Sequence, residues 1–168
     1  MALSPAELQS SARAWRSALM VSDVGMALLG SKKFRMYREF SANSTLRFVA
    51  TKPFLLTDQR LWTGQGNVRI SISTGGTPAG TFTDISTQFC LNTKDTLPVP
   101  ACTVQAGGTV SGGTERDVLR SYSGNGGGVG VGSDIGGSRL LAAGTYYFTI
   151  VVEGTTIGMY SFEWEELE

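Results

Sequence analysis

Two alternating runs near the end of the chain constrain its fold more strongly than any other feature. Residues 143–152 read AGTYYFTIVV and residues 158–164 read GMYSFEW, with a short polar connection between them. Apolar and aromatic side chains recur at every second position, which is typical of strands with one buried face. The side chains on these faces are Tyr146, Phe148, Ile150 and Val152 in the first run and Tyr160, Phe162 and Trp164 in the second. We predict an antiparallel hairpin whose aromatic face must be covered by a second sheet.

The rest of the chain can supply that second sheet. Strand-like patterns occur at 33–40, 46–51, 54–62, 68–72, 81–83, 87–90, 101–104 and 114–122. Glycine clusters at 75–80, 107–109 and 112–113 predict turns between them. Strands at such short intervals, without helices between them, predict an all-β domain over residues 31–168. The expected architecture is an antiparallel β-sandwich of the jelly-roll-like type.

An N-terminal helical arm is predicted over residues 1–30. Ser4, Pro5 and Glu7 form a helix start signal, because the serine can cap, the proline fits the first turn and the glutamate completes a capping box. The helix is expected to continue to about residue 20. Its apolar stripe consists of Leu8, Ala12, Trp15 and Leu19. We predict that this stripe docks onto a partner chain, and packing against the chain's own sandwich is the alternative.

The composition limits the classes of function. The 14 basic and 14 acidic residues give zero formal net charge, which argues against nucleic-acid binding by phosphate neutralisation and against a polybasic membrane anchor. The chain has no histidine, which excludes Ser-His-Asp triads and histidine-based metal sites. We therefore expect no enzymatic activity, no cofactor and no metal. The sequence lacks a signal-peptide pattern and a long apolar run, so synthesis in a cytoplasm without membrane insertion is expected.

A glycine-rich segment at residues 124–138 is the one stretch of low complexity. It has no Walker lysine and no glycine pattern in a strand-loop-helix context, which argues against a phosphate-binding loop. Two interpretations remain open, an exposed loop or a contact between subunits. The residues concerned are Gly126, Gly128, Val129, Val131 and Ile135.

The cysteines and tryptophans also leave alternatives open. Cys90 and Cys102 flank a turn-like segment, and they either form a disulfide or remain two partly buried thiols. Trp15, Trp62 and Trp164 either belong to the core or offer a platform on which a sugar can stack.

Charged residues are expected mainly on solvent-facing surfaces. Arg35, Arg38 and Arg47 form either a basic strip for an acidic partner or the solvated side of a sheet. The acidic residues of the tail at 163–168, EWEELE, are predicted to lie on the solvent side of the last strand and in a frayed end.

Several motifs, taken in order, resemble those of small virion structural proteins of tailed bacteriophages. They are KFRMYREF at 33–40, LRFVA at 46–50, TGGTPAGTF at 74–82, GGTVSGGT at 107–114, AGTYY at 143–147 and YSFEWEE at 160–166. The resemblance extends over nearly the whole chain and includes its length and the leading helix.

This resemblance implies a non-enzymatic component of the virion that is present in several copies and synthesised in the cytoplasm of a bacterial host. Its partners would be other capsid or tail proteins and further copies of itself. A capsid decoration or head fibre and a tail fibre or baseplate component are both compatible with it. The alternative is a carbohydrate-binding β-sandwich module that recognises glycans on the host surface.

Overall fold

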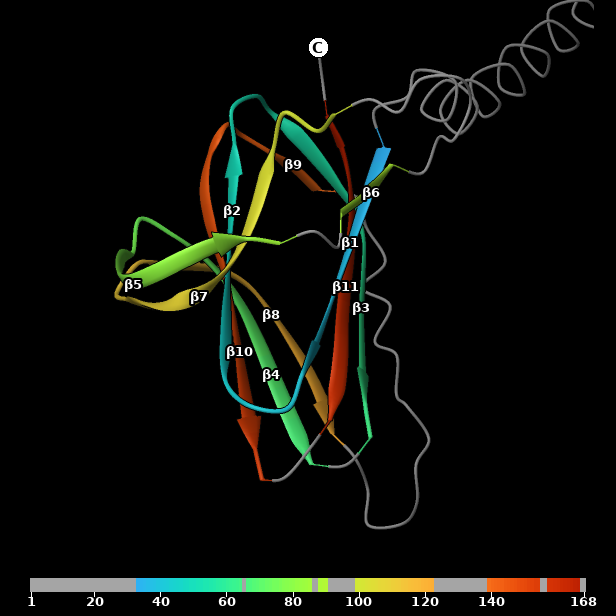
Figure 1. The fold of residues 1–168 in the computed structure, drawn as a ribbon, viewed down its shortest axis with the longest axis vertical. Coiled ribbons are helices and arrows are strands. Elements are labelled where there is room, and N and C mark those ends of the chain that lie inside the picture. The colour runs from blue at the N-terminus through green and yellow to red at the C-terminus, as the bar shows by residue number, and fades with distance from the viewer. Residues whose placement is uncertain are drawn as a thin grey trace, which may run out of the picture.

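The computed structural model describes residues 33–64, 66–85, 88–90, 99–122, 139–154 and 157–166 (Figure 1). All regular secondary structure within these ranges is β-strand, eleven strands in total. The all-β prediction is therefore confirmed for the described part of the chain. The predicted helix and the glycine-rich segment at 124–138 lie outside these ranges.

The strands form two sheets that are antiparallel throughout and face each other (Figure 1). Sheet A contains, in spatial order, β6 (Gln88–Cys90), β1 (Lys33–Phe40), β11 (Gly158–Glu166), β3 (Phe54–Thr63) and β9 (Arg139–Leu141). Sheet B contains β5 (Thr77–Asp84), β7 (Thr103–Ser111), β2 (Ser44–Ala50), β10 (Gly144–Glu153), β4 (Asn67–Thr74) and β8 (Thr114–Tyr122). The short strand β9 was not predicted from the sequence.

The strand pairs are nested along the chain. β1 pairs with β11, β2 with β10, β3 with β9, β4 with β8, and β5 with β7. The chain is thus folded as one long antiparallel ribbon in which the first half runs against the second. From β1–β11 to β4–β8, successive pairs of this ribbon alternate between sheet A and sheet B. Consecutive strands in this part of the chain therefore face each other across the core.

The predicted hairpin of residues 143–152 and 158–164 is wrong in its pairing, although both strands exist. β10 belongs to sheet B and β11 to sheet A. Their aromatic faces cover each other, because the rings of Phe148 and Phe162 stack with centroids 4.8 Å apart and planes 2° from parallel. The two alternating runs therefore supply both sides of the core.

Aromatic rings fill the centre between the sheets. Phe48 of β2 is fully buried and lies within ring-contact distance of Phe54, Phe148, Phe162 and Trp164. Phe54, Phe162 and Trp164 belong to sheet A, so their contacts with Phe48 tie the two sheets together, whereas Phe148 belongs to sheet B like Phe48. Burial of each large apolar side chain contributes about 1.5–3 kcal/mol to folding.

β3 changes the face that it buries halfway along its length. Its register against β11 skips Thr57, which makes a β-bulge. The even-numbered Phe54 and Leu56 are buried before the bulge, and the odd-numbered Leu61 is buried after it. Trp62 consequently faces outward and is 43% exposed.

Two glycine clusters that were predicted as turns lie partly inside strands. β5 begins at Thr77, within the predicted turn at 75–80, and β7 runs through Gly107 and Gly108. The pairing of β5 with β7 is irregular at this point. Gly108 has a φ of 56°, and a Cβ atom there would lie 2.4 Å from the ring of Phe82. The predicted turn at 112–113 is confirmed, because it separates β7 from β8.

The irregular pairing brings β5 back over the outer face of sheet B. The ring of Phe82 lies 6.2 Å from that of Tyr147, and the guanidinium carbon of Arg47 lies 4.6 Å from the Phe82 centroid. Arg47 also donates a hydrogen bond to Gln105. Arg47 is thus engaged within sheet B, whereas Arg35 lies on sheet A. The structure does not bring these two arginines together in the basic strip considered from the sequence.

The prediction that the acidic tail faces solvent is wrong for Glu163 and Glu166, and residues 167–168 lie outside the described ranges. The carboxylate of Glu166 accepts hydrogen bonds from the backbone N–H groups of Ala101 and Cys102, both at 2.9 Å. It also accepts one from the indole of Trp164 at 3.3 Å. The end of β11 therefore holds the segment that leads into β7, and Glu166 ties sheet A to sheet B.

Glu163 is the second tail residue that is not solvated, since its side chain is 9% exposed. One of its carboxylate oxygens accepts from Arg35 Nε at 2.8 Å and the other lies 2.9 Å from Lys33 Nζ. Burial by itself would raise the pKa of Glu163. The hydrogen bonds and charges of Arg35 and Lys33 outweigh that effect and lower the pKa below its ordinary value of 4.5.

We expect Glu163→Gln to lower the free energy of unfolding by about 1–2 kcal/mol at neutral pH, because both cations lose their partner. A carboxyl group with a lowered pKa in the folded state stabilises the protein above its unfolded pKa. This contribution is lost as the pH falls through the folded value. Urea unfolding at about pH 7 and about pH 3 should show a difference between variant and wild type that shrinks at low pH. The exposed Glu39→Gln serves as the control, and an equal difference at both pH values would contradict the assignment.

Candidate functional site

The outer face of sheet A carries a shallow groove of about 410 Å³. We call it the Trp62 groove. Its lining residues are Arg35, Tyr37, Arg60, Leu61, Trp62, Met159 and Ser161. They come from three adjacent strands, β1, β11 and β3, so the paired backbone of sheet A fixes their spacing.

The apolar part of the groove is a pair of side chains directly opposite each other. Trp62 on β3 is paired in register with Met159 on β11. Trp62 is 43% exposed and Met159 37% exposed, and both belong to the few large apolar residues at the surface of the described part of the chain. The bulge at Thr57 is the reason why Trp62 points here rather than into the core.

The polar part of the groove consists of two arginines, each of which is bound by a carboxylate of the same sheet. Arg35 is bound by Glu163, and Arg60 Nε donates to Asp58 Oδ2 at 2.8 Å. The two arginine side chains remain 45% and 62% exposed. Each is therefore oriented by a carboxylate within the sheet while part of its guanidinium stays accessible from the groove.

This arrangement suits recognition by contact. A tryptophan face and a methionine offer apolar area, and oriented guanidinium groups beside them offer hydrogen-bond donors. Tryptophan, tyrosine, arginine and methionine are the residues enriched in protein–protein interfaces. An exposed tryptophan on a sheet also provides a surface on which a sugar ring can stack.

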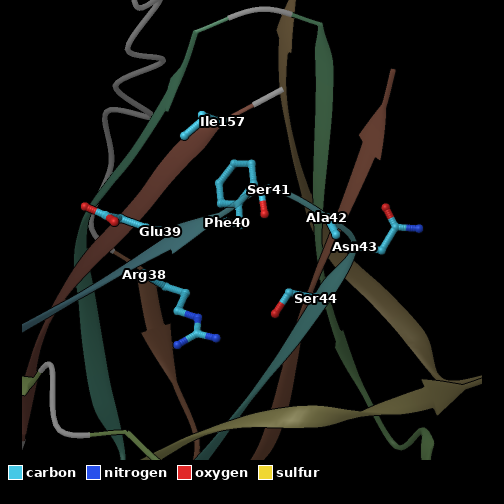
Figure 2. A pocket seen from close by; sticks show the side chains of 8 residues that line it. All are labelled: Arg38, Glu39, Phe40, Ser41, Ala42, Asn43, Ser44 and Ile157. Carbon is cyan, nitrogen blue, oxygen red and sulfur yellow. The ribbon is translucent and has the colours of Figure 1, made fainter. Parts of the chain in front are cut away.

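A second hollow lies at the connection from β1 to β2 (Figure 2). Figure 2 shows the guanidinium of Arg38 and the hydroxyl of Ser44 on one side of it and the ring of Phe40 towards Ile157. Asn43 is used structurally, because its Oδ1 accepts from the backbone N–H of Val152 at 2.8 Å. Among the described residues that line this hollow, Arg38 is the only cationic one. The Trp62 groove combines aromatic, apolar and cationic groups from three strands, and it is the stronger candidate.

Of the three tryptophans that the sequence offered as a sugar platform, the structure describes two and places them in different environments. Trp164 is fully buried in the core, where its ring stacks on Phe34 with centroids 5.5 Å apart. Trp62 is the exposed one, and Trp15 lies outside the described residues. Sequence analysis named Trp62, and the alternation of Tyr160, Phe162 and Trp164 implied that Met159 lies on the opposite face of its strand. It gave no signal that Met159 and Tyr37 line a groove.

The other predicted site residues fall mostly outside the described part of the chain. This holds for the helix stripe (Leu8, Ala12, Trp15 and Leu19) and for the glycine-rich segment (Gly126, Gly128, Val129, Val131 and Ile135). Cys102 is a free and buried thiol, which is the alternative to the disulfide with Cys90. The side chain of Cys90 is not among those described.

Two kinds of feature are absent from the described ranges. No helix there is long and apolar enough to cross a membrane. No group of three or more cysteine, aspartate or glutamate side chains in these ranges is placed to hold a metal ion.

Comparisons with known proteins add no relative. No protein-family model matches the chain, and neither the curated proteins nor the solved structures contain a significant match.

Proposed function

We propose that this protein is a non-enzymatic structural subunit of a tailed-phage virion, exposed in several copies as a decoration, fibre or baseplate component. The motifs shared with small virion proteins support the proposal. The nested strand pairs that alternate between two facing sheets support it as well, because this is the order of a jelly roll. Jelly rolls recur in viral capsid proteins and in lectins. Since one fold serves many functions, the function depends on the residues at the surface.

The Trp62 groove is the observation that carries the proposal. It presents Trp62, Tyr37 and Met159 beside two oriented arginines. Such residues supply most of the binding energy in protein interfaces. The proposal assigns this groove to a contact with a neighbouring copy of the chain in the virion.

Two further contacts belong to the same proposal. The helix stripe of Leu8, Ala12, Trp15 and Leu19 would dock onto the capsid or tail, and the segment at 124–138 would lie between subunits or at an exposed tip. Both extend the assembly beyond the groove, and deletion of residues 1–20 tests the helix stripe separately.

We expect the full chain to self-associate and Trp62→Ala to weaken that association. Loss of an interface hot spot costs about 2 kcal/mol or more, which corresponds to roughly a thirtyfold rise in the dissociation constant. Light scattering over a concentration series measures the oligomeric state of the wild type and of the variant. Because Trp62 is already 43% exposed, the variant should keep the wild-type unfolding midpoint within a few degrees.

The matched control is Val99→Ala, which removes an 88% exposed apolar side chain away from the groove. It should leave association unchanged. A chain that is monomeric at every concentration would contradict the proposed contact between copies. Unchanged association of Trp62→Ala would contradict the role of the groove.

Binding of host-surface carbohydrate is the second candidate, and the exposed indole of Trp62 favours it. A sugar ring can stack on this indole while the neighbouring guanidinium groups donate to its hydroxyls. Retention on a glycan array should then be lost in Trp62→Ala and partly kept in Trp62→Phe. An array on which wild type and Trp62→Ala behave alike would exclude a glycan at this site.

A further inference from the structure

A third hollow lies where the two sheets meet at one edge, away from the Trp62 groove. We call it the arginine hollow. Its lining residues are Thr74, Arg116, Arg139, Leu140, Leu141, Ala142 and Tyr146. The two arginines in this lining come from opposite sheets, Arg116 from β8 of sheet B and Arg139 from β9 of sheet A.

Arg116 is the extra residue of a β-bulge. The register of β4 against β8 passes from the Ile72–Asp117 pair to the Ser73–Glu115 pair and leaves Arg116 without a partner position. A bulge redirects the side chain of its extra residue. Here Arg116 lines the hollow, and its Nε donates to Thr74 Oγ1 at 3.1 Å.

Arg139 is fixed by Asp117. Its Nη1 lies 2.8 Å from Asp117 Oδ2, and the aspartate side chain is only 12% exposed. Asp117 is held in turn by the backbone N–H of Val118 at 2.8 Å and by Gln59 Nε2 at 3.5 Å. The carboxylate of Asp117 is therefore fully engaged and orients the guanidinium of Arg139 beside the hollow.

The charges around the hollow do not balance. Asp117 compensates one of the two arginines, and Glu115, the other carboxylate of this part of β8, binds Arg69 instead. Arg116 makes no ion pair with any residue of the described ranges. The hollow thus holds one uncompensated guanidinium, next to a second one that is already oriented.

We infer that the arginine hollow binds the carboxylate group of a small organic acid. The planar guanidinium of Arg116 matches a carboxylate, which can accept two parallel hydrogen bonds from its terminal nitrogens. Leu140, which is 67% exposed, supplies an apolar side chain at the hollow for the remainder of the ligand. An acidic sugar and the C-terminal carboxylate of a peptide both carry this chemistry.

Titration of the ¹⁵N-labelled full chain, followed by NMR, tests the inference with both kinds of acid. The probes are methyl glucuronide and acetyl-dialanine, and the neutral controls are methyl glucoside and the amide of acetyl-dialanine. We expect at least one acid to shift resonances of Arg116 and β9, while its neutral control does not. Arg116→Gln should weaken that binding about tenfold or more, because a hydrogen-bonded charge pair is lost.

Arg38→Gln is the control, because it removes an exposed arginine that lines the hollow between β1 and β2 and not the arginine hollow. This control should bind the acid like wild type. Trp62→Ala should also bind it like wild type, so that binding at the arginine hollow can be distinguished from any contact at the Trp62 groove. The acid that binds identifies the source of the carboxylate. The inference is overturned if neither acid binds, if the neutral controls bind equally well, or if Arg116→Gln retains wild-type affinity.

Discussion

Phe162→Ala is expected to lower the free energy of unfolding by about 3–5 kcal/mol, the largest effect of any substitution considered. Phe162 is 1% exposed and stacks on Phe148 of the opposite sheet. Its ring also lies 5.6 Å from those of Phe48 and Trp164. Removing it leaves a cavity between the sheets that these rigid rings cannot close. Urea unfolding followed by tryptophan fluorescence measures the loss.

Met159→Ala provides the comparison on the same strand. Met159 is 37% exposed on the outer face of sheet A, so its truncation should cost about 0.5 kcal/mol or less. If Phe162→Ala cost no more than Met159→Ala, the facing arrangement of β10 and β11 would be wrong. Should Phe162→Ala not fold, Phe162→Leu gives a smaller loss in the same direction.

Gly158→Ala is expected to destabilise the protein by about 2–3 kcal/mol, although it adds a single methyl group. A Cβ atom at this position would lie 2.4 Å from the ring of Phe40 and 2.8 Å from the backbone oxygen of Trp62. Phe40 is buried and the oxygen belongs to the neighbouring strand β3, so neither can move aside easily. The thermal unfolding midpoint and the free energy from urea unfolding should both fall.

Gly64→Ala is the matched control at the same end of sheet A. The nearest atom to an added Cβ there is the backbone oxygen of Ile157 at 3.4 Å, an ordinary contact. This variant should be neutral or slightly stabilising, because alanine reduces the freedom of the unfolded chain. Equal behaviour of the two variants would show that Phe40 does not pack against Gly158.

The all-β class and most strands could be predicted from alternation, but the pairing of consecutive strands could not. The pattern of β10 and β11 requires that each bury one face, and this is equally true of two paired strands and of two strands that face each other. A short connection allows both arrangements. Deciding between them takes the long-range pairs of β10 with β2 and β4 and of β11 with β1 and β3, which local periodicity does not encode.

The groove was only partly predictable because a bulge decides which face Trp62 occupies. Strict alternation from Phe54 would place Trp62 on the same face as Leu56, in the core. Because Thr57 has no partner position on β11, the residues after it alternate in the opposite sense, with odd-numbered side chains in the core. Nothing in the local sequence marks Thr57 as the residue without a partner position. Arg116 in β8 is a second case, since its direction also depends on a register shift. Both candidate sites therefore arise where the period of two is broken.

The prediction of turns at the glycine clusters 75–80 and 107–109 was partly wrong for a related reason. Glycine permits both a turn and a strongly twisted or bulged strand, and the sequence does not distinguish them. Strand β7 carries glycine at positions 107 and 108 because Phe82 and the β5 backbone approach these positions too closely to leave room for a side chain.

The nested ribbon has a consequence for how the protein is made. Lys33 at the start of β1 pairs with Glu165 at the end of β11, so the outermost pair closes only after β11 has been synthesised. Until then β1 has no partner on its β11 side, and the Trp164 ring that covers Phe34 is missing. Pairings this distant in sequence form slowly and leave apolar strands accessible to aggregation. The synthesis of β11 therefore sets the time at which the nascent chain is protected from aggregation with other nascent chains on the same polysome.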